Sequence, residues 1–231
     1  MKPFRLLSVL ILSVIFLTSS NLYAADLSKL EKRLKDCDEV INEIMQMPDK
    51  AIPTDLLSKC AAVAIFPYVL KGGFFVGARY GKGVIIAHDP RTGKWKSPAF
   101  FTIGGGSFGL QFGAQAIDLI LVIMNERGLE GLLKDRVTLG GDAAVAAGPV
   151  GRSASADTDL LLKAGIFSYS RSKGFFAGVA VKGAVIAPDK KANQAYYGGP
   201  VDVKEIILGD KIIPPASSRN LINTLNEFST K

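Results

Sequence analysis

Residue types that carry catalysis are scarce in this chain. A nucleophilic triad needs a histidine base, and His88 is the only histidine among the 231 residues. It stands between Ala87 and Asp89-Pro90, a context typical of an exposed turn. Two cysteines and one histidine are also too few to complete a metal shell. We therefore expect no enzymatic activity, no cofactor and no metal site.

A glycine motif at residues 104–109 matches the Gly-x-Gly-x-x-Gly dinucleotide fingerprint. That fingerprint needs a helix that begins at its third glycine, so that the helix N-terminus meets the pyrophosphate. Here Phe108, Leu110 and Phe112 alternate with small or polar residues, which is typical of a strand. The glycines therefore indicate bending or a close approach of strands, and we expect neither a nucleotide nor a nucleic-acid partner.

Basic residues are the more suggestive group, since the chain carries a formal charge of +7. They gather in two sections, and the candidates for one cationic surface are Lys71, Arg79, Lys82, Arg152, Arg171 and Lys173. Each lysine or arginine near an anionic leaflet contributes roughly 1 kcal/mol of binding free energy. Such a set predicts a peripheral lipid site, and the alternative is a set of ordinary solvated turns.

The two cysteines, Cys37 and Cys60, permit two interpretations. In an oxidising compartment an exported pair is a disulfide candidate. The alternative is two small buried side chains on neighbouring helices.

The N-terminus is typical of a secretory signal peptide over residues 1–24. Lys2 and Arg5 precede an apolar run, and Ala24 offers a small residue for cleavage. The alternative is an uncleaved anchor, although the run is short for a span of about 20 residues. Cleavage leaves 26 basic and 21 acidic residues, a charge of +5. We expect an exported protein, periplasmic or extracellular, with one domain over residues 25–231.

The elements that must position these residues alternate between helical and β patterns. Helices are predicted at Asp26–Met47, from Pro53 to Cys60, at Ala114–Arg127 with a shorter one at Leu129–Lys134, and from Ser217 or Ser218 to Phe228. Strands are predicted at Ala61–Tyr68, Gly73–Tyr80, Val84–Ala87, Ala99–Ile103, Leu160–Arg171, Gly174–Val181, Ala184–Ala187 and Val201–Leu208, with Gly81–Gly83 as a turn and Gly104–Gly106 as a break.

One stretch occurs twice, about a hundred residues apart. Ile-Phe-x-Tyr and then Gly-Phe-Phe-x-Gly begin at Ile65 and again at Ile166, and each copy closes on an aspartate, Asp89 or Asp189. The fold class predicted is therefore α+β. It has mostly antiparallel β sections built from two related halves, an N-terminal helical hairpin, a central helix and a C-terminal helix. Similar hairpins would set Lys71 and Lys173 at related turns.

Several blocks resemble the SYLF domain, a lipid-binding family that includes yeast actin-binding proteins of endocytosis. The matching blocks, which cover nearly all of the chain after residue 24, include Ile65-Phe66-Pro67, residues 73–81, residues 104–109, residues 147–152, residues 169–174 and residues 195–198. The chain departs from the eukaryotic members in its predicted signal peptide and its lone domain without an adaptor module, so we expect an exported, bacterial member of this family.

The resemblance implies binding of anionic phospholipid, including phosphoinositide-like headgroups, through basic turns and an amphipathic N-terminal helix. Carried onto this chain, the contacts are the six basic residues named above and the basic face of residues 26–47. The alternative is a protein-interaction or structural factor, similar to the actin-binding members, without lipid specificity. A third hypothesis is a carrier that holds a lipid chain inside the β section.

Overall fold

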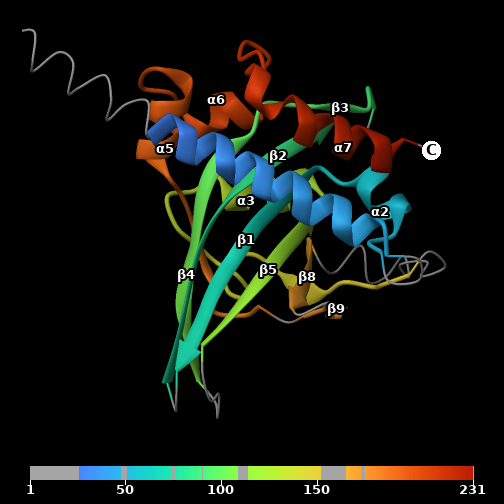
Figure 1. Cartoon of the computed structure of the whole chain (residues 1–231), viewed down its shortest axis with the longest axis vertical. Coiled ribbons are helices and arrows are strands. Elements are labelled where there is room, and N and C mark those ends of the chain that lie inside the picture. The colour runs from blue at the N-terminus through green and yellow to red at the C-terminus, as the bar shows by residue number, and fades with distance from the viewer. Residues whose placement is uncertain are drawn as a thin grey trace, which may run out of the picture.

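A computed structural model describes residues 26–47, 51–73, 76–89, 91–108, 114–151, 165–172, 175–179 and 181–230. The predictions for the signal peptide, Phe74-Phe75, Arg152 and Lys173 lie outside these residues. What is described confirms the α+β class, because helices cover a large and mostly antiparallel sheet (Figure 1).

The sheet has ten strands among the described residues, with a main path in the order β6-β10-β4-β2-β1-β5-β8-β7. β3 pairs with β2, and β9 pairs with β8, while only β7 runs parallel to its neighbour. The strands are β1 Ala62–Gly73, β2 Val76–Asp89, β3 Lys94–Trp95, β4 Ala99–Phe108, β5 Ala114–Ile123, β6 Val137–Thr138, β7 Val145–Ala147, β8 Ile166–Ser172, β9 Phe175–Gly178 and β10 Val185–Pro188.

Helices cover both faces of this sheet and enclose two apolar clusters. The described helices after the first are α2 Thr54–Lys59, α3 Glu126–Leu132, α5 Lys190–Tyr197, α6 Val203–Ile207 and α7 Arg219–Ser229. The first helix, residues 26–45, crosses one face beside α7, whereas β1 and β4 continue past this helical layer toward the lower end in Figure 1. Among the described residues, no helix covers the distal half of the sheet on that face.

The N-terminal helix confirms the predicted amphipathic pattern. Leu30, Leu34, Cys37, Ile41 and Ile44 are all buried against the sheet, in the cluster that Ile65 and Phe100 also join. Because this apolar stripe is covered, it packs the protein core and is not presented to a bilayer.

The predicted central helix at Ala114–Arg127 is wrong over most of its length. Residues 114–123 form β5, and the helix α3 begins only at Glu126 behind an Asn125 cap. Leu119, Leu121 and Ile123 face one apolar cluster, and Ile120 and Val122 face the other. A strand buried on both faces reads as a continuous apolar run, which sequence periodicity cannot distinguish from a buried helix.

Two glycine runs predicted to interrupt strands lie inside them. β2 passes straight through Gly81–Gly83, and β4 continues through Gly104–Gly106 to Phe108. A Cβ atom at Gly83 would lie 2.0 Å from the Ile65 carbonyl oxygen, so glycine there permits a close approach of β1. Gly105, at φ 149°, likewise leaves room for the Gly183 carbonyl.

The last predicted strand, Val201–Leu208, is also wrong, because α6 occupies Val203–Ile207. Asp202 caps it by accepting from the Lys204 backbone N–H at 2.9 Å. The C-terminal helix is confirmed as α7, although a short 3-10 turn, Ala216–Ser218, precedes it and the Ser218 side chain does not cap it.

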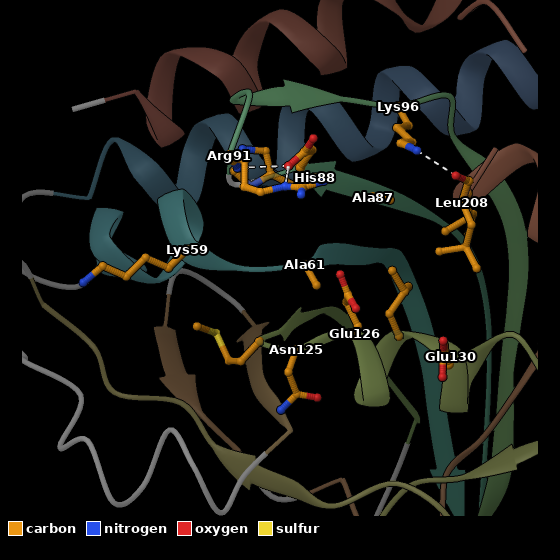
Figure 2. Close-up of a pocket in the computed structure, with 14 residues that line it drawn as sticks. Lys59, Ala61, Ala87, His88, Arg91, Lys96, Asn125, Glu126, Glu130 and Leu208 are labelled. Carbon is orange, nitrogen blue, oxygen red and sulfur yellow. Dashed lines mark hydrogen bonds and ion pairs between the residues drawn. The ribbon is translucent and has the colours of Figure 1, made fainter. Parts of the chain in front are cut away.

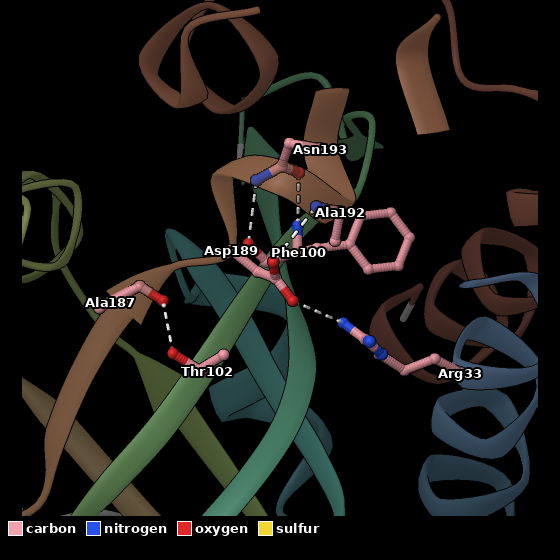
Figure 3. A network of polar contacts seen from close by, with 7 residues as sticks. All are labelled: Arg33, Phe100, Thr102, Ala187, Asp189, Ala192 and Asn193. Carbon is pink, nitrogen blue, oxygen red and sulfur yellow. Dashed lines mark hydrogen bonds and ion pairs between the residues drawn. The ribbon is translucent and has the colours of Figure 1, made fainter. Parts of the chain in front are cut away.

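A polar network fixes α5 against β4 and the N-terminal helix (Figure 3). The Asn193 side chain accepts from the Phe100 N–H at 2.8 Å and donates to the Phe100 carbonyl at 3.0 Å. Asp189 caps α5 through the Ala192 N–H and forms an ion pair with Arg33 at 3.5 Å. The second copy of the repeat therefore ends at Asp189, which connects α5 and the N-terminal helix above the sheet.

None of the described helices combines the length and the hydropathy that crossing a bilayer requires.

Candidate functional site

Two of the predicted basic residues lie next to each other on the sheet. Lys71 on β1 and Arg79 on β2 are direct cross-strand partners, and Gln115 on β5 is the partner of Lys71 on the other side. Gln115 Nε2 donates in turn to the Ser172 hydroxyl on β8 at 2.5 Å. Four neighbouring strands thus contribute one polar row near the distal end of the sheet.

The two cations of this row have no acidic partner among the described residues. Arg79 Nε–H is buried and donates no hydrogen bond to any described residue, and burial lowers the pKa of the Arg79 guanidinium. Like charges placed directly opposite each other destabilise a sheet, and a buried donor without a partner costs about 1–3 kcal/mol. An anion bound between Lys71 and Arg79 would relieve both effects.

An apolar row lies next to the polar one, toward the core. Val69 and Ile117 are cross-strand partners, and Leu119, Val179 and Val181 complete the lining. Together the two rows enclose a cavity of about 190 Å³, whose polar lining also includes Ser170 and Ser172. The cavity lies on the face opposite to the N-terminal helix, because Val69 and Leu119 belong to the other apolar cluster.

The structure does not bring the remaining predicted contacts into this row. Lys82 is three residues after Arg79 on β2, so its side chain points to the opposite face of the sheet. There it lines a hollow beside Tyr80. Arg171 is engaged internally, since its Nε donates to Asp118 Oδ2 at 2.9 Å and its guanidinium also pairs with Glu43. Arg152 and Lys173 lie outside the described residues.

The basic face of the N-terminal helix is largely neutralised. Lys29 pairs with Asp26, and Lys32 pairs with Asp36 four residues on. Lys35 pairs similarly with Glu39. Lys71 and Arg79 therefore differ from the helix lysines in having no such partner within the described chain.

Exposed apolar side chains gather on the opposite face of the same two strands. Tyr68 is 55% exposed, Leu70 61% and Tyr80 53%, and all three line the hollow that contains Lys82. Tyrosine is a side chain that favours a boundary between water and an apolar phase. The sequence pattern did not reveal this group, because Tyr68 lies in a β-bulge that shifts the register of β1.

A second, larger cavity lies at the other end of the strands (Figure 2). Its volume is about 540 Å³, and its cations already have partners. Lys96 donates to the Leu208 carbonyl at 2.8 Å, Lys59 pairs with Asp55, and Arg91 pairs with Asp89. This cavity consequently offers no unpaired cation for an anionic ligand.

His88 lines this second cavity, and its predicted place in an exposed turn is wrong. It lies within β2, is 6% exposed and stacks on Trp95 with ring centroids 4.4 Å apart. Its Nδ1–H donates to the Cys60 carbonyl at 3.0 Å, and burial lowers the pKa of the imidazole. These contacts give His88 a packing role.

Ser107 stands in a Gly-x-Ser-x-Gly pattern that the search for catalytic residues missed. The nucleophile elbow of that pattern requires a strand-to-helix turn, but Ser107 lies inside β4 and pairs with Gly77. Its backbone therefore lacks the elbow geometry.

Both cysteines are free, buried thiols. The disulfide interpretation is therefore wrong, and the interpretation as two small buried side chains is confirmed. Cys37 Sγ donates to the Ile65 carbonyl at 3.6 Å, and Cys60 Sγ donates to the Leu57 carbonyl at 3.2 Å. Burial raises the pKa of the Cys60 thiol to about 12, so the reactive thiolate is disfavoured.

Comparison with known proteins assigns the chain to a family. The model of the family described as Ysc84, Las17-binding protein actin regulator, matches residues 104–228, which is more than half of the chain. The chain belongs to the Ysc84 family. This assignment confirms the resemblance to SYLF domains.

Relatives of this Ysc84-family chain include mammalian and yeast proteins. It is 32% identical to the SH3 domain-containing YSC84-like protein 1 of Rattus norvegicus over 88% of the chain, and 33% identical to the Homo sapiens protein of that name. It is 36% identical to Protein YSC84 of Saccharomyces cerevisiae over 73% of the chain. The matched part spans 61% of the rat protein and 36% of the yeast protein.

Proposed function

We propose that this Ysc84-family protein binds anionic membrane lipids and uses Lys71 and Arg79 to hold a negatively charged headgroup. The observation that carries the proposal is the pair itself: two cations face each other across β1 and β2, and neither has an acidic partner among the residues that the structure describes. Hydroxyl and amide groups of Ser172 and Gln115 continue the row. A phosphate or carboxylate would find charge and several donors there.

The surroundings of the pair support contact with a membrane surface. The opposite face of β1 and β2 exposes Leu70, Tyr80 and Lys82 in a hollow toward the distal end of the sheet, where it borders Lys29 and Arg33 of the N-terminal helix. An apolar and cationic surface of this kind suits the boundary of an anionic bilayer. The protein docks by this end, as a non-enzymatic peripheral component of the cell envelope after export.

Vesicle co-sedimentation tests the proposal. The purified protein should pellet with phosphatidylcholine vesicles that contain phosphatidylglycerol, and binding should weaken as the salt concentration rises. Vesicles of phosphatidylcholine alone should leave it in the supernatant. Equal pelleting with both vesicles, or no pelleting with either at low salt, would overturn the proposal.

A second candidate function is the binding of a protein partner. The printed family description, Las17-binding protein actin regulator, supports it. Contact with such a partner through apolar surface is not screened by ions, so pull-downs from envelope extracts would survive high salt and detergent. Loss of every bound protein in high salt would count against this candidate.

A further inference from the structure

We propose that the cavity behind Lys71 and Arg79 holds the hydrocarbon chain of a single anionic amphiphile, with its carboxylate or phosphate on the two cations. This inference deepens the proposed function and rests on the same anionic site. It adds that the ligand's chain leaves the bilayer or the solvent and enters the protein.

The order of side chains along the strands supports this orientation. On β1, Lys71 and Val69 point to the same face, two residues apart, and on β5, Gln115, Ile117 and Leu119 do the same. The polar members lie at the distal end and the apolar members lie toward the core. A ligand that satisfies both must be charged at one end and apolar along its length.

The burial of the lining side chains increases from the polar row toward the apolar row. Val69, Leu119 and Val181 are almost wholly buried, whereas Lys71 and Arg79 are partly exposed and Gln115 is exposed. Serine hydroxyls of Ser170 and Ser172 lie along one wall, and Val179 lies near them. The charged end of the ligand is therefore nearest to water, and its chain is furthest from it.

The size of the cavity selects the class of ligand. About 190 Å³ is below the roughly 300–1,000 Å³ of sites that bury most of a drug-sized molecule. It cannot enclose both chains of a phospholipid, but it accepts part of one chain. Single-chain amphiphiles, such as fatty-acid anions and lysophospholipids, fit this description.

Calorimetric titration with butanoate, hexanoate, octanoate and decanoate tests the inference. The titrations are made in water, at concentrations below those at which these fatty acids form micelles. All four share one carboxylate, so only the chain changes. The dissociation constant should fall about fourfold for each added methylene, until the chain outgrows the cavity. Octanol, which lacks the charge, and inorganic phosphate, which lacks the chain, should both bind more weakly than octanoate.

Two substitutions separate the chain from the headgroup. Ile117→Phe fills the apolar row and should abolish the dependence on chain length while butanoate and phosphate bind as before. Ile213→Phe makes the same change at a residue that is 84% exposed and lines neither the cavity nor the hollow; it is the matched control and should leave fatty-acid binding unchanged. Arg79→Gln should weaken octanoate binding at least tenfold, since a hydrogen-bonded charge is lost.

Methyl resonances of Val69, Leu119 and Val181 give a readout in the unsubstituted protein. Octanoate should shift them, and phosphate should leave them in place. Equal affinity for butanoate and decanoate, or unshifted methyl resonances, would overturn the inference even if anionic vesicles bind. Failure of vesicle binding with retained octanoate binding would instead overturn the membrane proposal alone.

Discussion

The first copy of the repeated stretch, in β1 and β2, and the second copy, in β8 to β10, place similar residues in different surroundings. Tyr68 has φ 51° in a bulge and is 55% exposed, whereas its counterpart Tyr169 is wholly buried and stacks on Phe176. Ile65 faces the N-terminal helix, whereas Ile166 faces the other apolar cluster. The same local sequence gives a strand twice, but register with β5 decides which face is buried.

The two copies also continue differently. In the first, β2 runs for 14 residues beside β1. In the second, β9 ends after four residues, and β10 joins β4 near the other edge of the sheet. The first copy thus forms the long hairpin with Lys71 and Arg79, and the second copy supports the core.

The largest expected difference lies between the two tyrosines. Tyr169→Ala should destabilise the protein by about 3–5 kcal/mol, because a large buried ring leaves a cavity. Tyr68→Ala should change the free energy of unfolding by less than about 0.5 kcal/mol, as at an exposed site. Urea denaturation measures both. Equal losses would show that the copies share one structural role.

Asp118 joins the two copies across β5, and its removal should rank second. Its carboxylate accepts from the Tyr68 N–H at 3.0 Å and from Arg171 Nε at 2.9 Å, one contact in each copy. Asp118→Ala leaves a partly buried guanidinium without its main partner and should cost about 3 kcal/mol. The double variant Asp118→Leu with Arg171→Met should recover much of this loss, and a double variant as unstable as the single one would contradict this reading.

The closing aspartates of the copies should differ by a smaller amount. Asp189 caps α5 and pairs with Arg33, so Asp189→Ala should cost about 1 kcal/mol. Asp89 instead accepts from the Arg91 N–H in a turn beside β3, and Asp89→Ala should have the weaker effect. Thermal unfolding compares the two, and a greater loss for Asp89→Ala would reverse the assigned roles.

The smallest effect concerns pH, at the position where His88 in the first copy corresponds to Pro188 in the second. Burial lowers the pKa of folded His88 below about 6.5, its value in the unfolded chain. The stability that depends on neutral His88 is therefore complete above pH 6.5 and is lost as the pH falls through the folded pKa. The urea midpoint should fall more between pH 7.5 and 5.5 in the wild type than in His88→Leu, and parallel falls would contradict this.

The sequence predicted much of the fold where a pattern has one physical cause. The amphipathic spacing of the N-terminal helix has no strand alternative, and its apolar residues are buried as expected. β5 failed because both of its faces are buried, so no alternation remains. α6 was missed although the Asp202 cap and the spacing of Val203, Ile206 and Ile207 indicate a helix.

The candidate site was predictable only in part. Lys71 and Arg79 could be chosen as cations, but their pairing depends on the register of β1 and β2, which the bulge at Tyr68 shifts. Arg171 could not be separated from them, because its partner Asp118 is 53 residues away in the sequence. Which residue pairs with a charged side chain depends on contacts that are distant in the sequence, whereas strand and helix patterns depend on neighbouring residues.

The most direct test of the central claim is co-sedimentation of the Lys71→Gln, Arg79→Gln variant with phosphatidylglycerol vesicles. Lys94→Gln with Arg127→Gln is the matched control, since it removes the same charge from exposed positions at the other end of the strands. The account predicts that the site variant loses most vesicle binding at low salt while the control binds nearly as well as the wild type. Equal binding by the two variants would contradict it.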